Sequence, residues 1–407
     1  MFYNLVIYLY LLGVIILGFF NRKVRKMWKG EKHAFDILRR QVDPEARYLW
    51  FHAASLGEFE QGRPLMERIR ERHPEYKILL TFFSPSGYEV RKDYPGADII
   101  CYLPLDTPLN AQRFLRLARP SMAFFIKYEF WYNYLHLLRQ QGVPVYSVSS
   151  VFRPSQVFFK WYGLGYRDVL RCVTRFFVQN EESRQLLHSI HVDAVDVVGD
   201  TRFDRVLTIK RAAKRLPLVE AFVGEAPQVF VAGSSWPPDE DIFIRFFNAH
   251  PDWKLIIAPH VIAEEHLRQI LSKLNRETVR YTRATPETAA KASCLIIDCF
   301  GLLSSIYHYG NVAYIGGGFG VGIHNTLEAA VWDVPVIFGP NNRKFIEARG
   351  LLASGGGFEI NGYDDFHSLM CRFMSSPSFV KDVGKRAGSY VQSLSGASEK
   401  ILSRITL

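Results

Sequence analysis

The stretch from Phe51 to Leu65, FHAASLGEFEQGRPL, brings a serine, a glycine and a glutamate to the point where an apolar run gives way to a helical pattern. Ser55, Gly57 and Glu58 therefore lie between a predicted strand and the first turn of the next helix. A carboxylate in a first turn can simply compensate the helix dipole. The same position also suits a general base that removes a proton from a hydroxyl. The local sequence leaves both interpretations open.

A second acidic residue lies in a comparable position. Glu129, in KYEFWYNYLHLL, follows another apolar run and has Trp131 close by. Lys127 and Arg153 are the candidates for neutralising it. Glu129 is therefore either half of a structural ion pair or a site residue, and the sequence does not decide between them.

The most distinctive stretch is glycine-rich: YIGGGFGVGIHNTLEAAVWDVPVIFGP. A predicted strand ends in this loop, and a helix is expected to open around Asn325–Thr326 with Glu328 in its first turn. Glycines let backbone amides approach a phosphate, although the spacing matches neither GxGxxG nor GxxxxGK[ST]. Ser234, Ser235 and His260 end other apolar runs in this half. Polar turns at several strand ends favour a nucleotide-sugar pocket over a purely structural turn.

Metal chemistry has little support in the sequence. Asp239-Glu240-Asp241 is formally a DxD, but it follows Pro237-Pro238 and is expected to start a helix with solvated carboxylates. No HExxH or spaced His/Cys cluster occurs, so no catalytic metal and no cofactor are predicted. The cysteines form no CxxC pair, and we expect buried, reduced thiols. They are Cys101, Cys172, Cys294, Cys299 and Cys371.

Short apolar runs alternate with amphipathic segments, which predicts parallel βαβ units. The expected strands lie within residues 47–55, 77–83, 97–105, 121–129, 143–150, 174–180, 228–235, 253–260, 293–299, 312–318 and 334–340, with helices at 61–73, 107–119 and 131–142. A charged stretch near 205–225 separates two sets. We therefore predict an α/β chain with two Rossmann-like domains facing a central cleft, residues 22–205 and 206–407, the last helix being free to cross back to the first domain.

The N-terminal residues carry no charge from Phe2 to Phe20, long enough for a transmembrane helix within residues 1–21. Basic residues follow at once, which predicts that the rest of the chain is cytoplasmic. They are Arg22, Lys23, Arg25, Lys26 and Lys29. An interfacial helix or a hydrophobic hairpin is the alternative.

The chain of 407 residues has a net charge of +10, which favours an anionic partner. Residues 151–173 mix aromatic and basic side chains, as lipid-facing surfaces do, although a buried helix with a basic rim would look the same. Nucleic acid binding would rest on charge alone and is not expected, because much of the basic excess lies beside the apolar helix.

Taken together, these motifs resemble the 3-deoxy-D-manno-octulosonic acid (Kdo) transferases of lipopolysaccharide biosynthesis, which are GT-B glycosyltransferases of family 30. The family pattern HAxSxGE matches residues 52–58, and TPTG is similar to residues 84–87. YLPxD matches residues 102–106, ETELWPN corresponds to 127–133, and GNxKFD to 199–204. The pattern GGSFxxxGGHNxLEPAxxxxPVIFGP corresponds to residues 316–340.

This resemblance implies a GT-B fold and an inverting transfer of Kdo from CMP-Kdo to a lipid A precursor, lipid IVA, on the cytoplasmic face of the bacterial inner membrane. Glu58 matches the catalytic base. The resemblance assigns Ser55, Gly57 and Glu129 to the acceptor or reaction centre. Arg153, a candidate for neutralising Glu129, is expected in the same group. The implied donor-binding residues are Arg202, Ser234, Ser235, His260, Gly318, Gly320, Gly322, His324, Asn325, Thr326 and Glu328.

Some positions depart from the family pattern. Lys127 replaces an acid, Tyr132 a proline and Asp200 an asparagine, and the segment after His260 lacks the family's arginines. Contacts to the leaving group and the acceptor are therefore less defined than the role of Glu58. A GT-B transferase with a UDP-sugar donor and a lipid-linked acceptor, or a non-catalytic membrane-anchored protein of the same fold, remain the alternatives.

Overall fold

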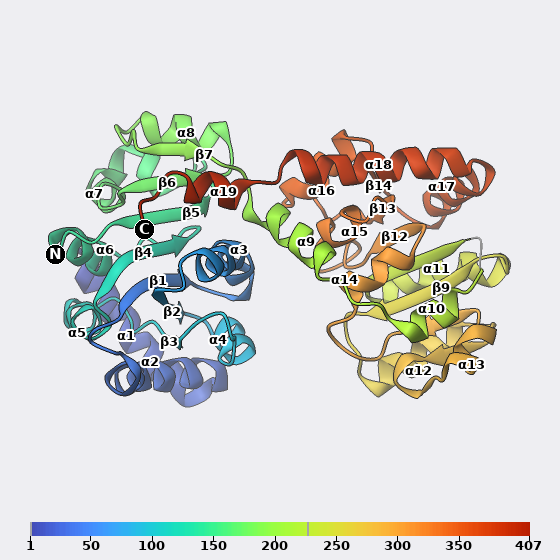
Figure 1. The fold of residues 1–407 in the computed structure, drawn as a ribbon, viewed down its shortest axis with the longest axis horizontal. Coiled ribbons are helices and arrows are strands. Elements are labelled where there is room, and N and C mark those ends of the chain that lie inside the picture. Colours follow the sequence, from blue (N-terminus) through green and yellow to red (C-terminus); the bar gives the residue numbers. More distant parts are fainter. Residues whose placement is uncertain (1, 226–227) are drawn as a thin grey trace. The chain divides into compact units, whose positions relative to one another are not determined.

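The computed structural model describes residues 2–225 and 228–407, which divide into two compact units. Unit 1 consists of Met1–Arg205 and Ser395–Leu407, and unit 2 of Val206–Leu394. Each unit is built on its own seven-stranded parallel sheet (Figure 1). Helix α9 (Thr201–Arg211) runs across the boundary in the chain.

The sheet of unit 1 has the order β3-β2-β1-β4-β5-β6-β7. The strands are β1 (Arg47–Ala53), β2 (Tyr76–Phe82), β3 (Ile99–Tyr102), β4 (Pro120–Ile126), β5 (Val145–Ser150), β6 (Arg175–Val178) and β7 (Val195–Val197). Strands that are buried on both faces are apolar nearly throughout, so most of these strands could be predicted from apolar runs in the sequence. The chain order reverses direction between β1 and β4, so their carboxyl ends form the topological switch point of this sheet.

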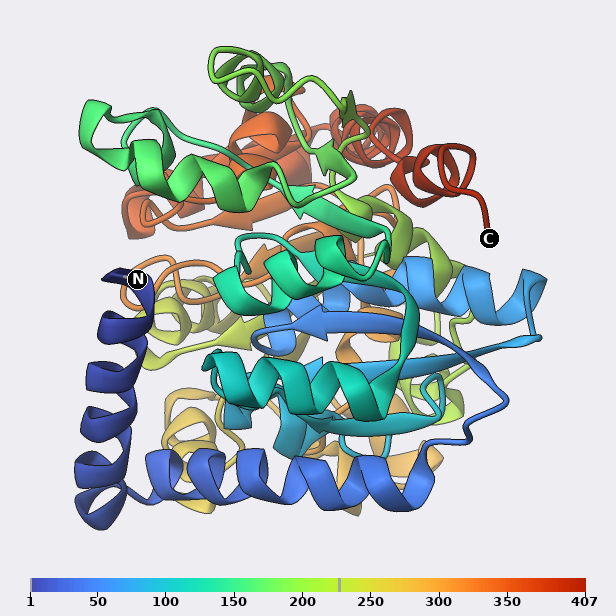
Figure 2. The same ribbon diagram turned by 90° about the vertical axis from the view of Figure 1, so that its left-hand side faces the viewer.

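Helices cover both faces of this sheet. Phe35 of α2, Phe114 of α5 and Tyr134 of α6 pack with Trp50 on one face, while Phe59 of α3 and Ile401 of α19 belong to the core on the other. Figure 2 shows α2, α5 and α6 in front of the strands. The helices are α1 (Phe2–Phe20), α2 (Arg22–Gln41), α3 (Leu56–Arg72), α4 (Pro85–Arg91), α5 (Pro108–Ala118), α6 (Tyr132–Gln140), η1 (Val157–Phe159), η2 (Trp161–Gly163), α7 (Leu164–Leu170), α8 (Glu181–His188) and α19 (Ala397–Leu402).

Unit 2 repeats this plan with the strand order β10-β11-β9-β8-β12-β13-β14. Its strands are β8 (Val229–Ser235), β9 (Lys254–Pro259), β10 (Thr278–Arg280), β11 (Cys294–Ile296), β12 (Val312–Ile315), β13 (Val336–Phe338) and β14 (Gly357–Glu359). The helices are α10 (Pro217–Val223), α11 (Pro237–Ala249), α12 (Glu264–Lys273), η3 (Tyr281–Arg283), α13 (Pro286–Lys291), α14 (Leu303–Ile306), η4 (Tyr307–Tyr309), α15 (Leu327–Ala330), α16 (Ile346–Ala353), α17 (Tyr363–Ser375) and α18 (Pro377–Ser393). The switch point of this sheet lies between β8 and β12.

Every apolar run that predicted a strand contains one. The sequence reading missed β7, β10 and β14, which have three residues each and lie at sheet edges. Such strands lack the continuous apolar run that burial on two faces imposes. All five cysteines are free, as expected, but the prediction that they are buried is wrong for Cys371, which is exposed, and for the half-buried Cys299.

The C-terminal segment returns to unit 1 and is held there by a buried carboxylate. Asp204, 2% exposed, accepts hydrogen bonds from the backbone amides of Gly396 at 2.5 Å and Ser398 at 2.7 Å. Ala397 and Ile401 then complete the core beside α3. Two charge-assisted bonds thus hold the first turn of α19 on unit 1.

We expect Asp204→Ala to lower the free energy of unfolding by about 2–4 kcal/mol, because two buried amides lose their acceptor. The urea midpoint of the variant measures this loss, and limited proteolysis should cut near residue 396. Asp168→Ala, which removes an exposed carboxylate of α7, is the control and should leave both unchanged. Equal midpoints for Asp204→Ala and wild type would contradict this role.

Candidate active site

The candidate catalytic residues of unit 1 follow the two strands at its switch point. Strands β1 and β4 pair in parallel, with His52 beside Phe125. The chain leaving β1 carries Ser55 and Glu58, and the chain leaving β4 carries Glu129. Because carboxyl ends of parallel strands share one edge, both acids lie on the ligand-binding side that this type of sheet provides.

Glu58 lies half-buried in the first turn of α3, and the hydroxyl of Ser55 donates a hydrogen bond to its carboxylate. Ser55 occupies the N-cap position but does not bond a backbone amide with its side chain, so its hydroxyl serves Glu58 instead. In the described part of the chain, Glu58 forms no ion pair. No basic side chain described here therefore pairs directly with its carboxylate.

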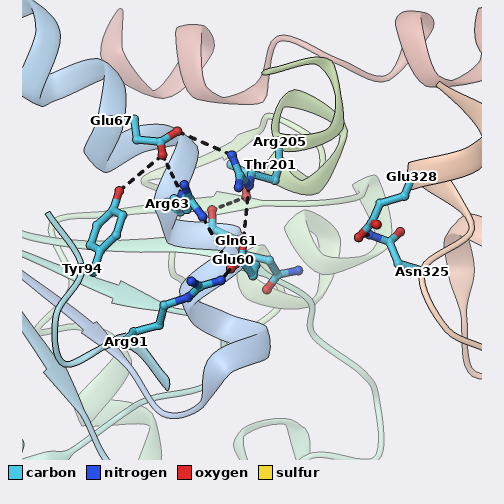
Figure 3. A network of polar contacts seen from close by, with 10 residues as sticks. All are labelled: Glu60, Gln61, Arg63, Glu67, Arg91, Tyr94, Thr201, Arg205, Asn325 and Glu328. Atoms are coloured by element: carbon cyan, nitrogen blue, oxygen red, sulfur yellow. Dashed lines mark hydrogen bonds and ion pairs between the residues drawn. The ribbon is translucent and has the colours of Figure 1, made fainter. Parts of the chain in front are cut away.

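Glu60, two residues further along α3, is in the opposite situation (Figure 3). Its carboxylate accepts hydrogen bonds from Arg91 at 2.7 Å and Arg205 at 3.2 Å. Glu67 pairs in turn with Arg63 at 2.6 Å. This network ties α3 to α4 and to the start of α9. Glu60 is a structural carboxylate, whereas Glu58 takes no part in this network.

Glu129 has partners that the sequence did not suggest. His52 Nε2 lies 3.4 Å from its carboxylate, and Trp131 Nε1 donates to the same oxygen at 2.9 Å. The expected neutralising partners, Lys127 and Arg153, are not paired with Glu129 among the described residues. His52 is fully buried, and its Nδ1 lies 2.9 Å from the Thr81 hydroxyl, which fixes the ring. The missed signal was the histidine that opens the HAAS stretch.

Several of the charged candidate residues of unit 1 lie near the side chain of Tyr128. Burial raises the pKa of its phenol; Glu58 and Asp200 raise it too, while Arg153 and Arg202 lower it, so all four lie within electrostatic range. Arg202 is held by Asp200, with Nε 2.8 Å and Nη2 2.7 Å from one carboxylate oxygen. The departure from asparagine at position 200 thus supplies an ion-pair partner for the guanidinium.

Gly57 is exposed, and a Cβ there would lie 3.7 Å from Ser55 Oγ, an ordinary contact. The fold of unit 1 therefore does not require glycine at this position.

In unit 2, the glycine loop lies at the equivalent switch point. Gly317 and Gly322 adopt positive φ angles of 92° and 106°, and a Cβ on Gly318 would lie 2.5 Å from the backbone of Gly339. Gly320 has open space around it, so its absence of a side chain is not demanded by unit 2 itself. Ser234 at the end of β8 also has a positive φ, 53°.

The carboxylates after β8 are buried, so the prediction that they are solvated is wrong for Asp239 and Glu240. Asp239 accepts hydrogen bonds from the Gly317 amide at 2.8 Å and the Tyr314 hydroxyl at 2.8 Å. Glu240 accepts from Ser235 at 2.9 Å and lies 3.0 Å from His266. These contacts brace the glycine loop and the end of β8. No group of three or more potential metal ligands occurs among the described residues.

Three aromatic rings stack beside this loop. The His260 ring lies 4.8 Å from that of Trp236 and 4.4 Å from that of His324. Trp236 Nε1 donates to His324 Nε2 at 3.2 Å, which requires an unprotonated nitrogen. Burial, with repulsion from His260, lowers the pKa of His324 to about 4. A cavity of about 120 Å³ adjoins these rings; its lining is Trp236, Pro238, Asp239, Gly317, Phe319, Gly320 and Val321.

The predicted helix after the loop is the single turn α15. Asn325 donates to Glu328 at 3.1 Å and accepts from the Leu327 amide at 3.1 Å (Figure 3). The Thr326 hydroxyl is fully buried and has no hydrogen-bond partner among the described residues. Of the predicted donor-binding residues, Arg202 lies in unit 1 with Asp200, and the others belong to unit 2.

Helix α1 is the one helix among the described residues that is long and apolar enough to cross a membrane. The stretch Tyr3–Phe20 of this helix has a mean hydropathy of 2.1, and 17% of it is buried. Buried core helices and signal sequences share these properties of length and composition. Low burial distinguishes α1 from a core helix, so it is a candidate for membrane attachment.

The two doubly wound parallel sheets define an α/β protein of the GT-B type of fold. A putative UDP-N-acetylglucosamine 2-epimerase from Listeria monocytogenes is similar with a TM-score of 0.61 at 11% identity, over 88% of this chain and 95% of that one. MurG from Acinetobacter baumannii is similar with a TM-score of 0.55 at 10% identity, over 88% and 99%.

Within this fold, the chain is similar to the Kdo transferases, as its motifs predicted. Residues 27–205 match the family model of 3-deoxy-D-manno-octulosonic-acid transferase. The 3-deoxy-D-manno-octulosonic acid transferase of Aquifex aeolicus is 25% identical over 359 residues, which cover 85% of this chain and 93% of that protein.

The lowered pKa of His324 predicts a pH dependence of stability. Its folded pKa, about 4, lies below the ordinary 6.5, so the unfolded chain takes up this proton first as the pH falls. The contribution is complete above pH 6.5 and is lost progressively towards pH 4. Urea midpoints at pH 7.5 and pH 5 should therefore differ less for His324→Gln than for wild type. His33→Gln, on an exposed face of α2, is the control.

Proposed function

We propose that this protein is an inverting glycosyltransferase that moves Kdo from CMP-Kdo to the lipid A precursor lipid IVA in lipopolysaccharide biosynthesis. The observation that carries the proposal is the similarity to a Kdo transferase over 85% of the chain. The match of the family model to residues 27–205 supports it independently on the side of unit 1.

In the proposed reaction, Glu58 is the general base. The acceptor hydroxyl oxygen bonds to the anomeric carbon of Kdo while its proton passes to the Glu58 carboxylate. The bond from that carbon to the phosphate oxygen breaks, and CMP leaves with the electron pair. Attack opposite the leaving group inverts the anomeric configuration. The absence of an ion pair on Glu58 among the described residues supports this role, because a carboxylate held by arginines would be a poorer base.

Ser55 is proposed to position the base, and Glu129 to act near the reaction centre. The Ser55 hydroxyl restricts the Glu58 carboxylate to one orientation in the first turn of α3. His52 and Trp131 hold Glu129 at the end of the adjacent strand. A rigid strand–turn–helix frame keeps such groups in a fixed geometry. Arg153 and Arg202, near Tyr128, are proposed to meet the anionic groups of the substrates.

Unit 2 is proposed to bind CMP-Kdo at the switch point between β8 and β12. The glycine loop leaves open space beside Gly320, where a phosphate can approach the backbone. Ser234, His260, His324 and Glu328 line the same edge of the sheet. The neutral state of His324 leaves it free to donate from Nδ1 to an anionic donor, since its Nε2 accepts from Trp236.

We expect Glu58→Gln to lower kcat by about 10²–10⁴-fold, the usual contribution of a general base. CMP-Kdo binding, followed by calorimetry, should be retained, because the substitution is nearly isosteric and lies in unit 1. Glu60→Gln is the matched control: it removes a carboxylate from the arginine network and should lower the urea midpoint but reduce kcat far less. Normal transfer by Glu58→Gln would reduce Glu58 to a helix-dipole carboxylate.

Donor choice tests the function as a whole. The purified full-length protein with lipid IVA should consume CMP-Kdo and yield a product whose mass increases by Kdo units. UDP-N-acetylglucosamine and other UDP-sugars should not be turned over. Turnover with a UDP-sugar alone would support the alternative GT-B transferase, and binding of CMP-Kdo without any turnover would support a non-catalytic protein.

A further inference from the structure

The amino-terminal end of α1 is bound to unit 1. The Tyr3 hydroxyl donates to the Asp106 carboxylate at 2.7 Å, and the Asn133 side chain donates to Asn4 at 2.8 Å. The Tyr3 ring also lies 5.1 Å from that of Tyr132. Asp106 follows β3, and Tyr132 and Asn133 follow β4, so these contacts lie at the carboxyl edge of the sheet.

The rest of α1 contacts the same unit. At its other end, Arg25 Nε donates to the Gly18 carbonyl at 2.7 Å. Val14 packs with Met27 and Tyr102. In the middle, Leu11 and Ile15 line a cavity of about 240 Å³ together with Trp28 and Phe35 of α2 and Pro104. In Figure 2, α1 runs along unit 1, at a steep angle to α2.

A helix that spans a bilayer could not make these contacts. Nineteen residues extend about 28 Å, close to the thickness of the hydrocarbon core. If α1 crossed it, Tyr3 and Asn4 would emerge on the side opposite to α2. Asp106 and Asn133, which belong to the folded core of unit 1, could not follow them. We propose that α1 does not span the membrane but lies flat along unit 1, as an interfacial helix embedded in one leaflet.

The surface that α1 leaves uncovered fits an anionic lipid bilayer. Its exposed side chains are Leu5, Val6, Tyr8, Leu9, Tyr10, Leu12, Ile16, Leu17, Phe19 and Phe20, which we call the apolar face of α1. Exposed apolar side chains gathered on one helix mark a contact with a membrane or another protein. Exposed basic residues follow directly on α2 and suit anionic headgroups. They are Arg22, Lys23, Lys26 and Lys29.

A second exposed apolar segment adjoins the start of α1. Trp161 is 84% exposed, and Tyr162 and Leu164 are also exposed. Both ribbon views show α7, which follows these residues, beside the amino-terminal end of α1 (Figures 1 and 2). Aromatic side chains favour the bilayer interface. The two segments together extend the lipid-facing surface of unit 1.

This arrangement has a consequence for the acceptor, which rests on the proposed function. The first turn of α1 contacts Tyr132 and Asn133, immediately beyond Glu129 and Trp131 in the chain. A leaflet that holds α1 would therefore present its headgroups to the edge of the sheet that carries the candidate catalytic acids. A lipid-held sugar would reach the site without leaving the leaflet.

The topology of the amino-terminal end tests the proposal without any measure of transfer. A single cysteine placed ahead of Met1, with Cys299→Ser and Cys371→Ser, is expressed in a Gram-negative host. A membrane-impermeant maleimide should label it only after spheroplasts are permeabilised. Labelling in intact spheroplasts would put this end in the periplasm and overturn the proposal, whatever the fate of the proposed function.

Cross-linking tests the contact itself. Tyr3→Cys with Tyr132→Cys should join under mild oxidation in isolated membranes, in the same background. Leu9→Cys with Tyr132→Cys is the matched control and should not join, because Leu9 is 60% exposed on the apolar face. A joined control with an unjoined test pair would overturn the proposal.

Vesicle binding tests whether lipid contacts the apolar face of α1. The full-length protein should co-sediment with vesicles of phosphatidylethanolamine and phosphatidylglycerol, and Leu9→Glu/Leu12→Glu should weaken this at least about tenfold. Phe300→Glu, at an exposed phenylalanine of unit 2, should bind as wild type does. Unchanged binding of the double variant, or equal loss in the control, would show that the apolar face of α1 is not the lipid contact.

Discussion

The parallel pairing of β1 with β4 is the constraint on which the candidate active site depends. Register brings His52 next to Phe125, so the turns after both strands leave the sheet side by side. One turn carries Ser55 and Glu58, and the other carries Glu129. His52 itself spans the two, because it is buried on β1 and its ring reaches the carboxylate that follows β4. The proposed chemistry thus rests on backbone hydrogen bonds in the sheet.

In unit 2, buried carboxylates hold the glycine loop in place. A glycine loop has little side-chain packing of its own to hold it, and free loops are costly to order. Asp239 bonds the Gly317 amide and the Tyr314 hydroxyl, and Glu240 bonds Ser235 and approaches His266. Desolvation raises the pKa of both acids, and these hydrogen bonds act in the opposite direction. These contacts therefore hold the loop at the end of the sheet, while Gly320 keeps open space around it.

In the proposed arrangement, unit 1 carries both the candidate base Glu58 and the helix that attaches the protein to the membrane, α1. Helix α1 carries apolar side chains on every side. Some of them pack on unit 1, whereas those of the apolar face are exposed and are proposed to contact lipid. Asp106 illustrates the cost of that packing: burial raises its pKa to about 7, and hydrogen bonds from Tyr3, Asn133 and Tyr134 offset this. A buried carboxylate bound in this way makes the position of α1 specific, since hydrophobic contact alone has no direction.

The sequence by itself determined the strands inside each sheet, the turn that carries Glu58 and the glycine loop, because these depend on local composition and on residues close together in the chain. It missed the edge strands β7, β10 and β14. It did not determine which of the two acids in this turn is paired with arginine. Glu58 and Glu60 look alike in sequence, and the difference is that Arg91 and Arg205, 31 and 145 residues from Glu60, reach it in the folded unit. The partners of Glu129, the burial of Asp239 and Glu240, and the contacts of α1 also come from distant segments. Local pattern predicts elements, whereas charge partners and solvent exposure are set only when sheets and helices pack.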